Sequence, residues 1–227
     1  MVALGGAVAT AETLKQLHQT MDAVSICKPV TKFSASVVAS DSVSEVVANA
    51  FRAAESGRPG AAYVNLPKDV MAAPCPHDVL PMPAYSGLGS ADSTAISEAA
   101  RLINSSENPV VLLGLLASKP ANAAALREFI GKKHLPVVGT FQAAGAVAAH
   151  LFENFGGRVG QLANQPCDRL LGAADLVVTI GYDPVEYPPS DWNRNNDRKI
   201  IHVDVQGPIW IMPIDLMSSS RAISPPR

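Results

Sequence analysis

The sequence has few aromatic residues and no cluster of basic ones. Phenylalanine, tryptophan and tyrosine make up 5% of the 227 residues, and the 18 lysines and arginines are spread along a chain of formal net charge -2. Proteins that bind nucleic acids usually combine a basic surface that follows the phosphates with aromatic side chains that stack on the bases. The composition therefore argues against a nucleic acid partner.

Cysteine is also scarce. The three cysteines, Cys27, Cys75 and Cys167, lie far apart and form no CxxC pair. This spacing fits neither a disulfide framework nor a zinc site. We therefore expect no metal site built on cysteine, and a reducing, cytoplasmic location.

Long hydrophobic runs are missing as well. The run at residues 110–117 falls well short of the roughly 18 residues that cross a bilayer, so we expect no membrane segment. The apolar start, VALGGAV, follows no basic residues and does not resemble a secretory signal. It reads instead as a buried strand entering a glycine turn, so we expect an earlier part of the domain to precede Met1.

Helices and strands alternate along the part of the chain that remains. Residues 41–57 have apolar residues at helical spacing and a glycine stop, and residues 61–66 read as a buried strand. Further on, helices are indicated at 90–108, 120–134 and 164–175, and strands at 110–117, 135–140, 176–182 and 198–205. Strands that are continuous Val/Ile/Leu runs between helices are typical of a parallel sheet covered on both faces. The predicted fold class is α/β, with doubly wound, Rossmann-like parallel sheets.

A proline-rich stretch divides these elements. Residues 73–91 contain Pro74, Pro76, Pro81 and Pro83, which favour a stiff, extended linker. We therefore predict a first domain at residues 1–72, the linker at 73–91 and a second domain at 92–206.

The residues alone do not identify a reaction. No P-loop, nucleophile elbow, carboxylate pair or metal motif is present, and the GGRVG of residues 156–160 does not lie between a strand and a helix as a dinucleotide loop would. His18 and Gln19 in LHQTMD are flanked by apolar residues, which favours packing over function, and Lys68 after AAYVNLP is by default a surface lysine.

The order of several motifs nevertheless resembles one family. These are VALGGAV, LHQTMDAV, PVTKF, SGRPGAAYVNLPKDV, VVLLGLLAS, FQAAGAV, NQPCDRLLGAADLVVTIGYDPVEYPPSDWN and IIHVDV. Together they are similar to acetolactate synthases of the catabolic, FAD-independent type, which are thiamine diphosphate enzymes. GRPG followed by PKDV is shared by many thiamine diphosphate enzymes, whereas GYDPVEY is closer to the catabolic synthases.

The resemblance implies both an architecture and an activity. Residues 1–72 correspond to the later part of a pyrimidine-binding domain and 92–206 to a Rossmann-like central domain, while the pyrophosphate-binding domain has no counterpart. The family condenses two pyruvates into 2-acetolactate and carbon dioxide, a step toward acetoin and butanediol. It uses thiamine diphosphate and Mg²⁺, and the intact enzyme is expected to be a homo-oligomer. We expect no bound FAD.

The same resemblance limits the site residues. The family's catalytic glutamate belongs to a segment upstream of Met1, and its GDG motif and metal-binding asparagine belong to the missing domain, so we expect no catalytic or metal residue here. The cofactor-binding residues are unknown. His18, Gln19 and Lys68 match positions that line the substrate in the family.

Three interpretations remain open. The first is a fragment of acetolactate synthase that is inactive alone, and the second is a fragment of another thiamine diphosphate decarboxylase or ligase. The third is a non-catalytic module that pairs with a full-length synthase.

The last residues depart from the family. Residues 207–227 show no helical or strand period, although an offset reading frame permits a continuation like the family's, so we expect an aberrant tail that arose by a change of frame. A central sheet without its last strand would then have an unpaired edge.

Overall fold

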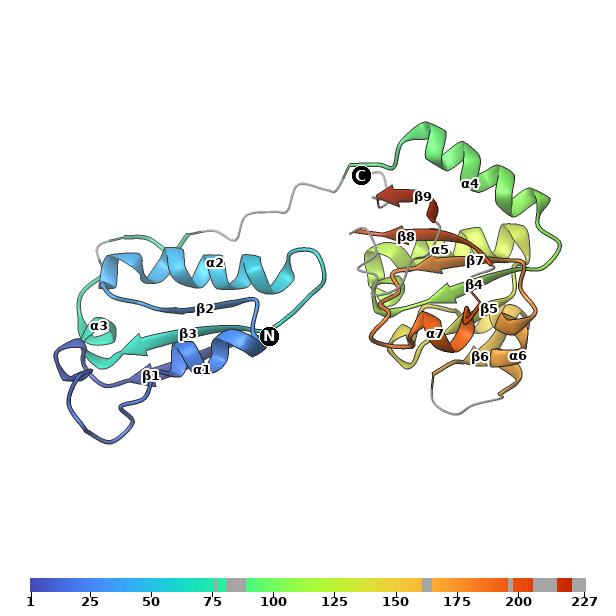
Figure 1. Ribbon diagram of the computed structural model, residues 1–227. Helices are drawn as coiled ribbons and strands as arrows, with labels where there is room; N and C mark the ends of the chain where they lie inside the picture. Colours follow the sequence, from blue (N-terminus) through green and yellow to red (C-terminus); the bar gives the residue numbers. More distant parts are fainter. Residues whose placement is uncertain (76, 81–88, 161–164, 196–197, 206–215, 222–227) are drawn as a thin grey trace. The chain divides into compact units, whose positions relative to one another are not determined.

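The structure, a computed structural model, describes residues 1–75, 77–80, 89–160, 165–195 and 198–205, and the backbone of 216–221 (Figure 1). The chain divides into two compact units, Met1–Ser86 and Gly87–Arg227. The predicted linker at 73–91 and the tail at 207–227 lie partly outside the described residues. Within the part of the chain that is described, no helix is long and apolar enough to cross a membrane.

Unit 1 is built on a three-stranded parallel sheet. The strand order is β1-β3-β2, and β3 pairs with both neighbours. The elements are β1 (Val2–Ala7), α1 (Ala23–Cys27), β2 (Phe33–Ser36), α2 (Val43–Glu55), β3 (Ala62–Pro67) and α3 (Lys68–Ala72), with short 3₁₀ turns at Thr10–Glu12, Lys28–Val30 and Ser40–Ser42.

Helix α2 covers one face of this sheet, as its apolar spacing predicted (Figure 1). Ala50 and Ala54 on the helix are buried in one cluster with Val37 and Val64 on the sheet side. Small residues on α2 let the helix approach the sheet closely, so the core of unit 1 lies between them.

Unit 2 is built on a six-stranded, wholly parallel sheet. The strand order is β6-β5-β4-β7-β8-β9, which is the doubly wound order. The elements are α4 (Ser93–Ser105), β4 (Pro109–Leu113), α5 (Pro120–Lys133), β5 (Val137–Gly139), β6 (Phe155–Arg158), α6 (Pro166–Gly172), β7 (Leu176–Ile180), α7 (Pro189–Trp192), β8 (Lys199–Asp204) and β9 (Leu216–Arg221), with 3₁₀ turns at Leu115–Ser118, Phe141–Ala143 and Ala149–Asn154.

The second sheet is buried on both faces, as the continuous apolar runs predicted. In β4, Val111 and Leu113 pack into one core with residues of α4 and α5. Val110 and Leu112 point the other way and pack into a second core with residues of α6 and α7. Alternate side chains of one strand thus serve two cores, and the predicted α/β fold with a doubly wound parallel sheet is confirmed.

Three sequence expectations for unit 2 were wrong in detail. The run at residues 110–117, predicted as one strand, ends as a strand at Leu113 because Gly114 turns the chain into a 3₁₀ turn. Residues 155–158, where no strand was predicted, form strand β6. The stretch after residue 206 was expected to contain no strand, yet the backbone of β9 pairs in parallel with β8, since ladder bonds depend on backbone groups rather than on side-chain period.

Candidate functional site

A cavity of about 230 Å³ lies at the carboxyl end of the unit 1 sheet. It is formed where β1, β2 and β3 end and where the chain after β1 passes in front of them. Carboxyl ends of parallel strands meet at one edge of a sheet, which is where α/β proteins commonly bind ligands. The lining residues are Ala7, Val8, Thr10, Thr13, Gln19, Thr20, Met21, Ser36, Val37, Val38, Asn65 and Pro67.

The polar side chains of this cavity are neutral. Asn65 Nδ2 donates to Ser36 Oγ at 3.2 Å, which joins the ends of β3 and β2, and Tyr63 OH donates to Asn65 Oδ1 at 3.2 Å. Burial, and then the nearby Cys27, raise the pKa of Tyr63, so this phenol stays protonated as a donor. Hydroxyl and amide groups of this kind suit a small polar ligand.

A carboxylate next to the cavity forms hydrogen bonds with the loop that follows β1. Asp69, in the first turn of α3, accepts a hydrogen bond from the Thr10 backbone N–H at 2.9 Å and a second from the Thr10 hydroxyl. The hydroxyl bond first, and the backbone bond next, lower the pKa of Asp69. The Thr10–Asp69 clamp therefore holds one wall of the cavity against the end of β3.

The structure places the three predicted residues around this cavity in different ways. Gln19 lines it, with its backbone in the left-handed region at φ 66°. Lys68 follows the lining residue Pro67 and is exposed. His18 is exposed and is not among the lining residues. The loop with Gln19 and the junction that carries Lys68 thus meet at one edge of the sheet.

Sequence reasoning missed Thr10, Asn65 and Asp69. The only available signal was the position of Asn65 and Asp69 at the end of a predicted strand, because parallel strands bring such residues to one edge.

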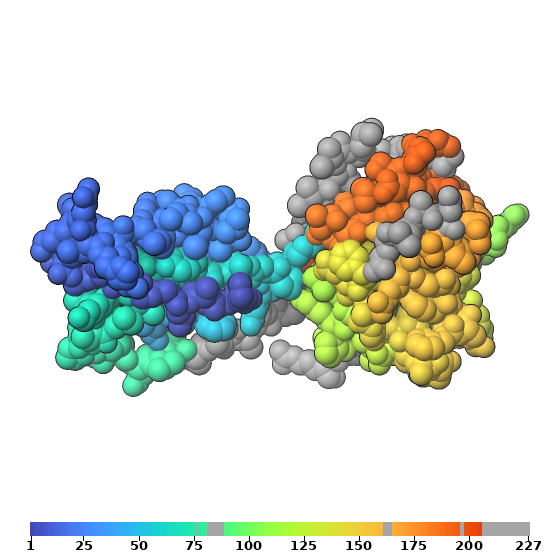
Figure 2. Space-filling model, turned by 90° about the horizontal axis from the view of Figure 1, so that it is seen from below, coloured from blue at the N-terminus to red at the C-terminus, as the bar shows by residue number. Residues whose placement is uncertain are grey.

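The loop that follows β1 and carries Gln19 is at the surface of unit 1, where its residues appear in blue (Figure 2). Its large apolar side chains are exposed, and Leu14 is 100% exposed.

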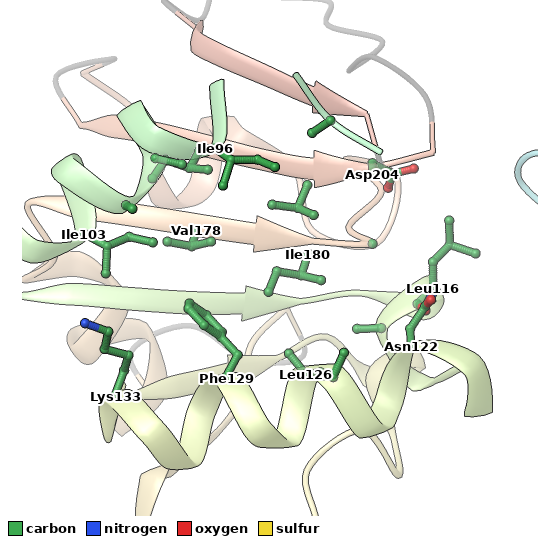
Figure 3. A pocket seen from close by; sticks show the side chains of 18 of the residues that line it. Ile96, Ile103, Leu116, Asn122, Leu126, Phe129, Lys133, Val178, Ile180 and Asp204 are labelled. Carbon is green, nitrogen blue, oxygen red and sulfur yellow. The ribbon is translucent and has the colours of Figure 1, made fainter. Parts of the chain in front are cut away.

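A second cavity, of about 350 Å³, lies in unit 2 on the face of the sheet between α4 and α5 (Figure 3). Its floor includes Val178 and Ile180 of β7, and its walls include Ile103 and Phe129. Lys133 lies toward one end and Asp204 toward the other (Figure 3). Because apolar side chains dominate the lining, this cavity offers no arrangement of acid, base or nucleophile.

Neither cavity supplies the groups that a metal-dependent cofactor needs. The described parts of the chain contain no cluster of three or more His, Cys, Asp or Glu side chains that could hold a metal ion. The cavity of unit 1 has no carboxylate among its lining residues. The residues that the structure describes therefore do not fit Mg²⁺ or a cofactor diphosphate bound through it.

Comparison with known proteins identifies the class of protein to which unit 2 is similar. The family model of the thiamine pyrophosphate enzyme central domain matches residues 96–208, which fall within unit 2. Residues 96–208 therefore form the central domain of a thiamine pyrophosphate enzyme. The Rossmann-like sheet described above is the fold of that domain.

Individual relatives of known function narrow this class to enzymes similar to acetolactate synthase. Over 205 residues the chain is 47% identical to the catabolic acetolactate synthase of Raoultella terrigena, and over 204 residues it is 43% identical to the acetolactate synthase of Bacillus subtilis. It is 28% identical over 231 residues to a glyoxylate carboligase of Escherichia coli. The resemblance to acetolactate synthases that the motifs indicated is confirmed.

The chain is much shorter than these relatives. Each synthase match covers 90% of this chain but 36% of the relative, and the carboligase match covers 98% of this chain and 38% of the relative. The chain thus spans about a third of the length of the curated relatives it matches.

Proposed function

We propose that this chain forms part of an acetolactate synthase that condenses two pyruvates into 2-acetolactate and carbon dioxide. The observation that carries the proposal is the 47% identity with a catabolic acetolactate synthase over 90% of the chain. The neutral polar cavity of unit 1 supports it, because its size and donors suit a small 2-oxo acid.

In this proposal the residues of unit 1 bind and orient the substrate. Gln19 lines the cavity, and its amide would donate to a pyruvate oxygen, while the exposed Lys68 ammonium next to the cavity attracts the pyruvate carboxylate. His18 precedes Gln19 in the same loop and contacts the substrate where it enters the cavity. The Thr10–Asp69 clamp keeps the loop that carries Gln19 next to the start of α3, which carries Lys68.

The cofactor chemistry belongs to other parts of the complete enzyme. Thiamine diphosphate, held with Mg²⁺, supplies the carbon nucleophile for this class of reaction. Since the described residues offer no ligands for the metal, we assign none of them to it. We further propose that the complete enzyme is a cytoplasmic homo-oligomer that uses no FAD.

A chimaeric enzyme tests the proposal. The aligned segment of the Raoultella terrigena synthase is replaced by this chain's residues 1–205, and acetolactate is measured after addition of pyruvate, thiamine diphosphate and Mg²⁺. We expect activity within about tenfold of the parent enzyme. In the same chimaera Gln19→Ala should raise KM for pyruvate about tenfold or more, because an amide hydrogen bond to a charged substrate contributes about 1.5–3 kcal/mol.

A matched variant separates binding from folding. Leu14→Ala changes a fully exposed side chain of the same loop and should leave kcat and KM unchanged. A chimaera that has the parent's circular dichroism spectrum and melting temperature but makes no acetolactate would contradict the proposal.

The carboligase relative supports a second candidate of the same chemistry. The name of that relative implies glyoxylate as its substrate, and its match extends over nearly the whole chain. A folded chimaera that prefers glyoxylate to pyruvate would favour this candidate. If the chain by itself instead co-purifies with a full-length synthase and alters its rate, the chain acts as a non-catalytic partner module.

A further inference from the structure

The crevice at the centre of the unit 2 sheet is occupied by the chain itself. In the order β6-β5-β4-β7-β8-β9, the connections run one way from β4 and the other way from β7, so the switch point lies between these two strands. Doubly wound sheets bind anionic ligands outside the carboxyl ends of the strands at such a point. In unit 2, residues of the chain's own loops lie at this ligand position, outside the carboxyl ends of β4 and β7.

Backbone contacts close one part of the crevice. A Cβ atom on Gly114, just after β4, would lie 2.4 Å from Tyr182 Cα, just after β7. The Gly114 N–H donates to Ile180 O at 3.0 Å, and the Leu116 N–H donates to Gly181 O at 3.1 Å. The two loops therefore touch backbone to backbone.

A buried carboxylate lies at the same end of these strands. Glu186 comes from the loop after β7 and is 6% exposed. Its Oε1 accepts a hydrogen bond at 3.2 Å from the N–H of Leu115, which begins the 3₁₀ turn just after β4. Its Oε2 accepts another from the hydroxyl of Thr140, which follows β5 and is 1% exposed. One carboxylate thus links the carboxyl ends of three neighbouring strands.

We propose that the Glu186 carboxylate is a built-in occupant of the anion position at this switch point, and that it excludes phosphate- and carboxylate-bearing ligands from unit 2. The donors, a backbone N–H and a hydroxyl, are those that bind a ligand oxyanion in other doubly wound proteins. Here the anion is covalently part of the chain, so a free oxyanion must displace a buried, hydrogen-bonded carboxylate. Glu186 is therefore a residue that determines ligand specificity, and this conclusion does not depend on the proposed synthase activity.

Removal of the side chain tests this assignment. Glu186→Ala leaves Leu115 N–H and Thr140 OH without their carboxylate and leaves a space of its size. We expect sodium acetate or inorganic phosphate, against sodium chloride of equal ionic strength, to raise the melting temperature of Glu186→Ala by about 3–6 °C at ten times the dissociation constant. The wild-type chain should show no such rise, and its Leu115 amide signal should not shift with phosphate.

The isosteric variant Glu186→Gln is the matched control. Its amide still fills the position and still accepts from Leu115 N–H, so neither anion should stabilise it. If Glu186→Ala does not fold in chloride, recovery of its near-ultraviolet circular dichroism signal on addition of acetate becomes the measurement. The proposal is overturned if the anions fail to stabilise or restore Glu186→Ala, if they stabilise Glu186→Gln equally, or if phosphate shifts the Leu115 amide of the wild type.

Discussion

At the scale of single residues, the candidate site depends on a contact between groups 59 positions apart, Thr10 and Asp69. The Asp69 carboxylate is exposed, so the contact orders the loop after β1 more than it stabilises the unit. The contact between Thr10 and Asp69 matters for the site because it places Gln19 and Lys68 around one cavity.

We expect this contact to depend on pH. Hydrogen bonds from Thr10 hold the pKa of Asp69 below its ordinary value of 3.8. A lowered folded-state pKa stabilises the fold above the unfolded-state pKa, and this stabilisation is lost as the pH falls through the folded-state value. Urea unfolding of the wild type and Asp69→Asn should therefore differ at pH 7 and converge as the pH falls below 3.8.

A double-mutant cycle provides the control. Thr10→Val removes the hydroxyl donor, so Thr10→Val combined with Asp69→Asn should destabilise less than the sum of the two single changes. An equal difference between the wild type and Asp69→Asn at pH 7 and pH 3 would show that the carboxylate has no such role.

At the scale of elements, the loops after β4 and β7 depend on glycine for steric reasons. Gly114 has φ -116°, which any residue can adopt, but its Cβ would meet the backbone of Tyr182. Gly114→Ala should therefore destabilise unit 2 by about 1–3 kcal/mol, measured by urea unfolding, because neither loop can move alone.

A second glycine provides the comparison. A Cβ on Gly172, at the end of α6, would meet nothing within 4 Å. Since alanine also favours a helix over glycine, Gly172→Ala should be neutral or stabilising by up to about 1 kcal/mol. Equal losses in Gly114→Ala and Gly172→Ala would argue against the steric explanation.

The elements also show how far the sequence could predict the fold. Helix α2 and the buried strands β3, β4, β7 and β8 followed from apolar spacing, because their own side chains form the cores. Strand β6 was missed because Gly156 and Gly157 carry no apolar pattern. Gly157 has a φ of 122°, in the region that favours glycine, so the backbone rather than an apolar pattern determines the residue there.

The candidate site was less predictable than the fold. Gln19 and Lys68 were selected only through resemblance to a family, because neither lies in a motif that demands its chemistry. Thr10 gave no signal, since its bonding to Asp69 depends on how three parallel strands align. Glu186, likewise, could be recognised only once the ends of β4, β5 and β7 were placed together.

At the scale of the whole molecule, the chain consists of two units that each have a separate sheet and separate cores. Units of this kind usually unfold as separate cooperative blocks. We therefore expect scanning calorimetry to resolve two transitions, and a destabilising change in one unit to shift only one of them.

Two glycine variants, one in each unit, test this independence. A Cβ on Gly5 in β1 would lie 2.3 Å from Tyr63 OH, so Gly5→Ala should cost unit 1 about 1–3 kcal/mol and lower one transition by several degrees. Gly6→Ala, whose Cβ would meet nothing within 4 Å, is the matched control and should leave that transition unchanged or raise it slightly. Gly114→Ala should lower only the other transition, and the double variant Gly5→Ala with Gly114→Ala should show both shifts at full size, because distant sites are additive. A single transition that either variant lowers would mean that the two units unfold as one.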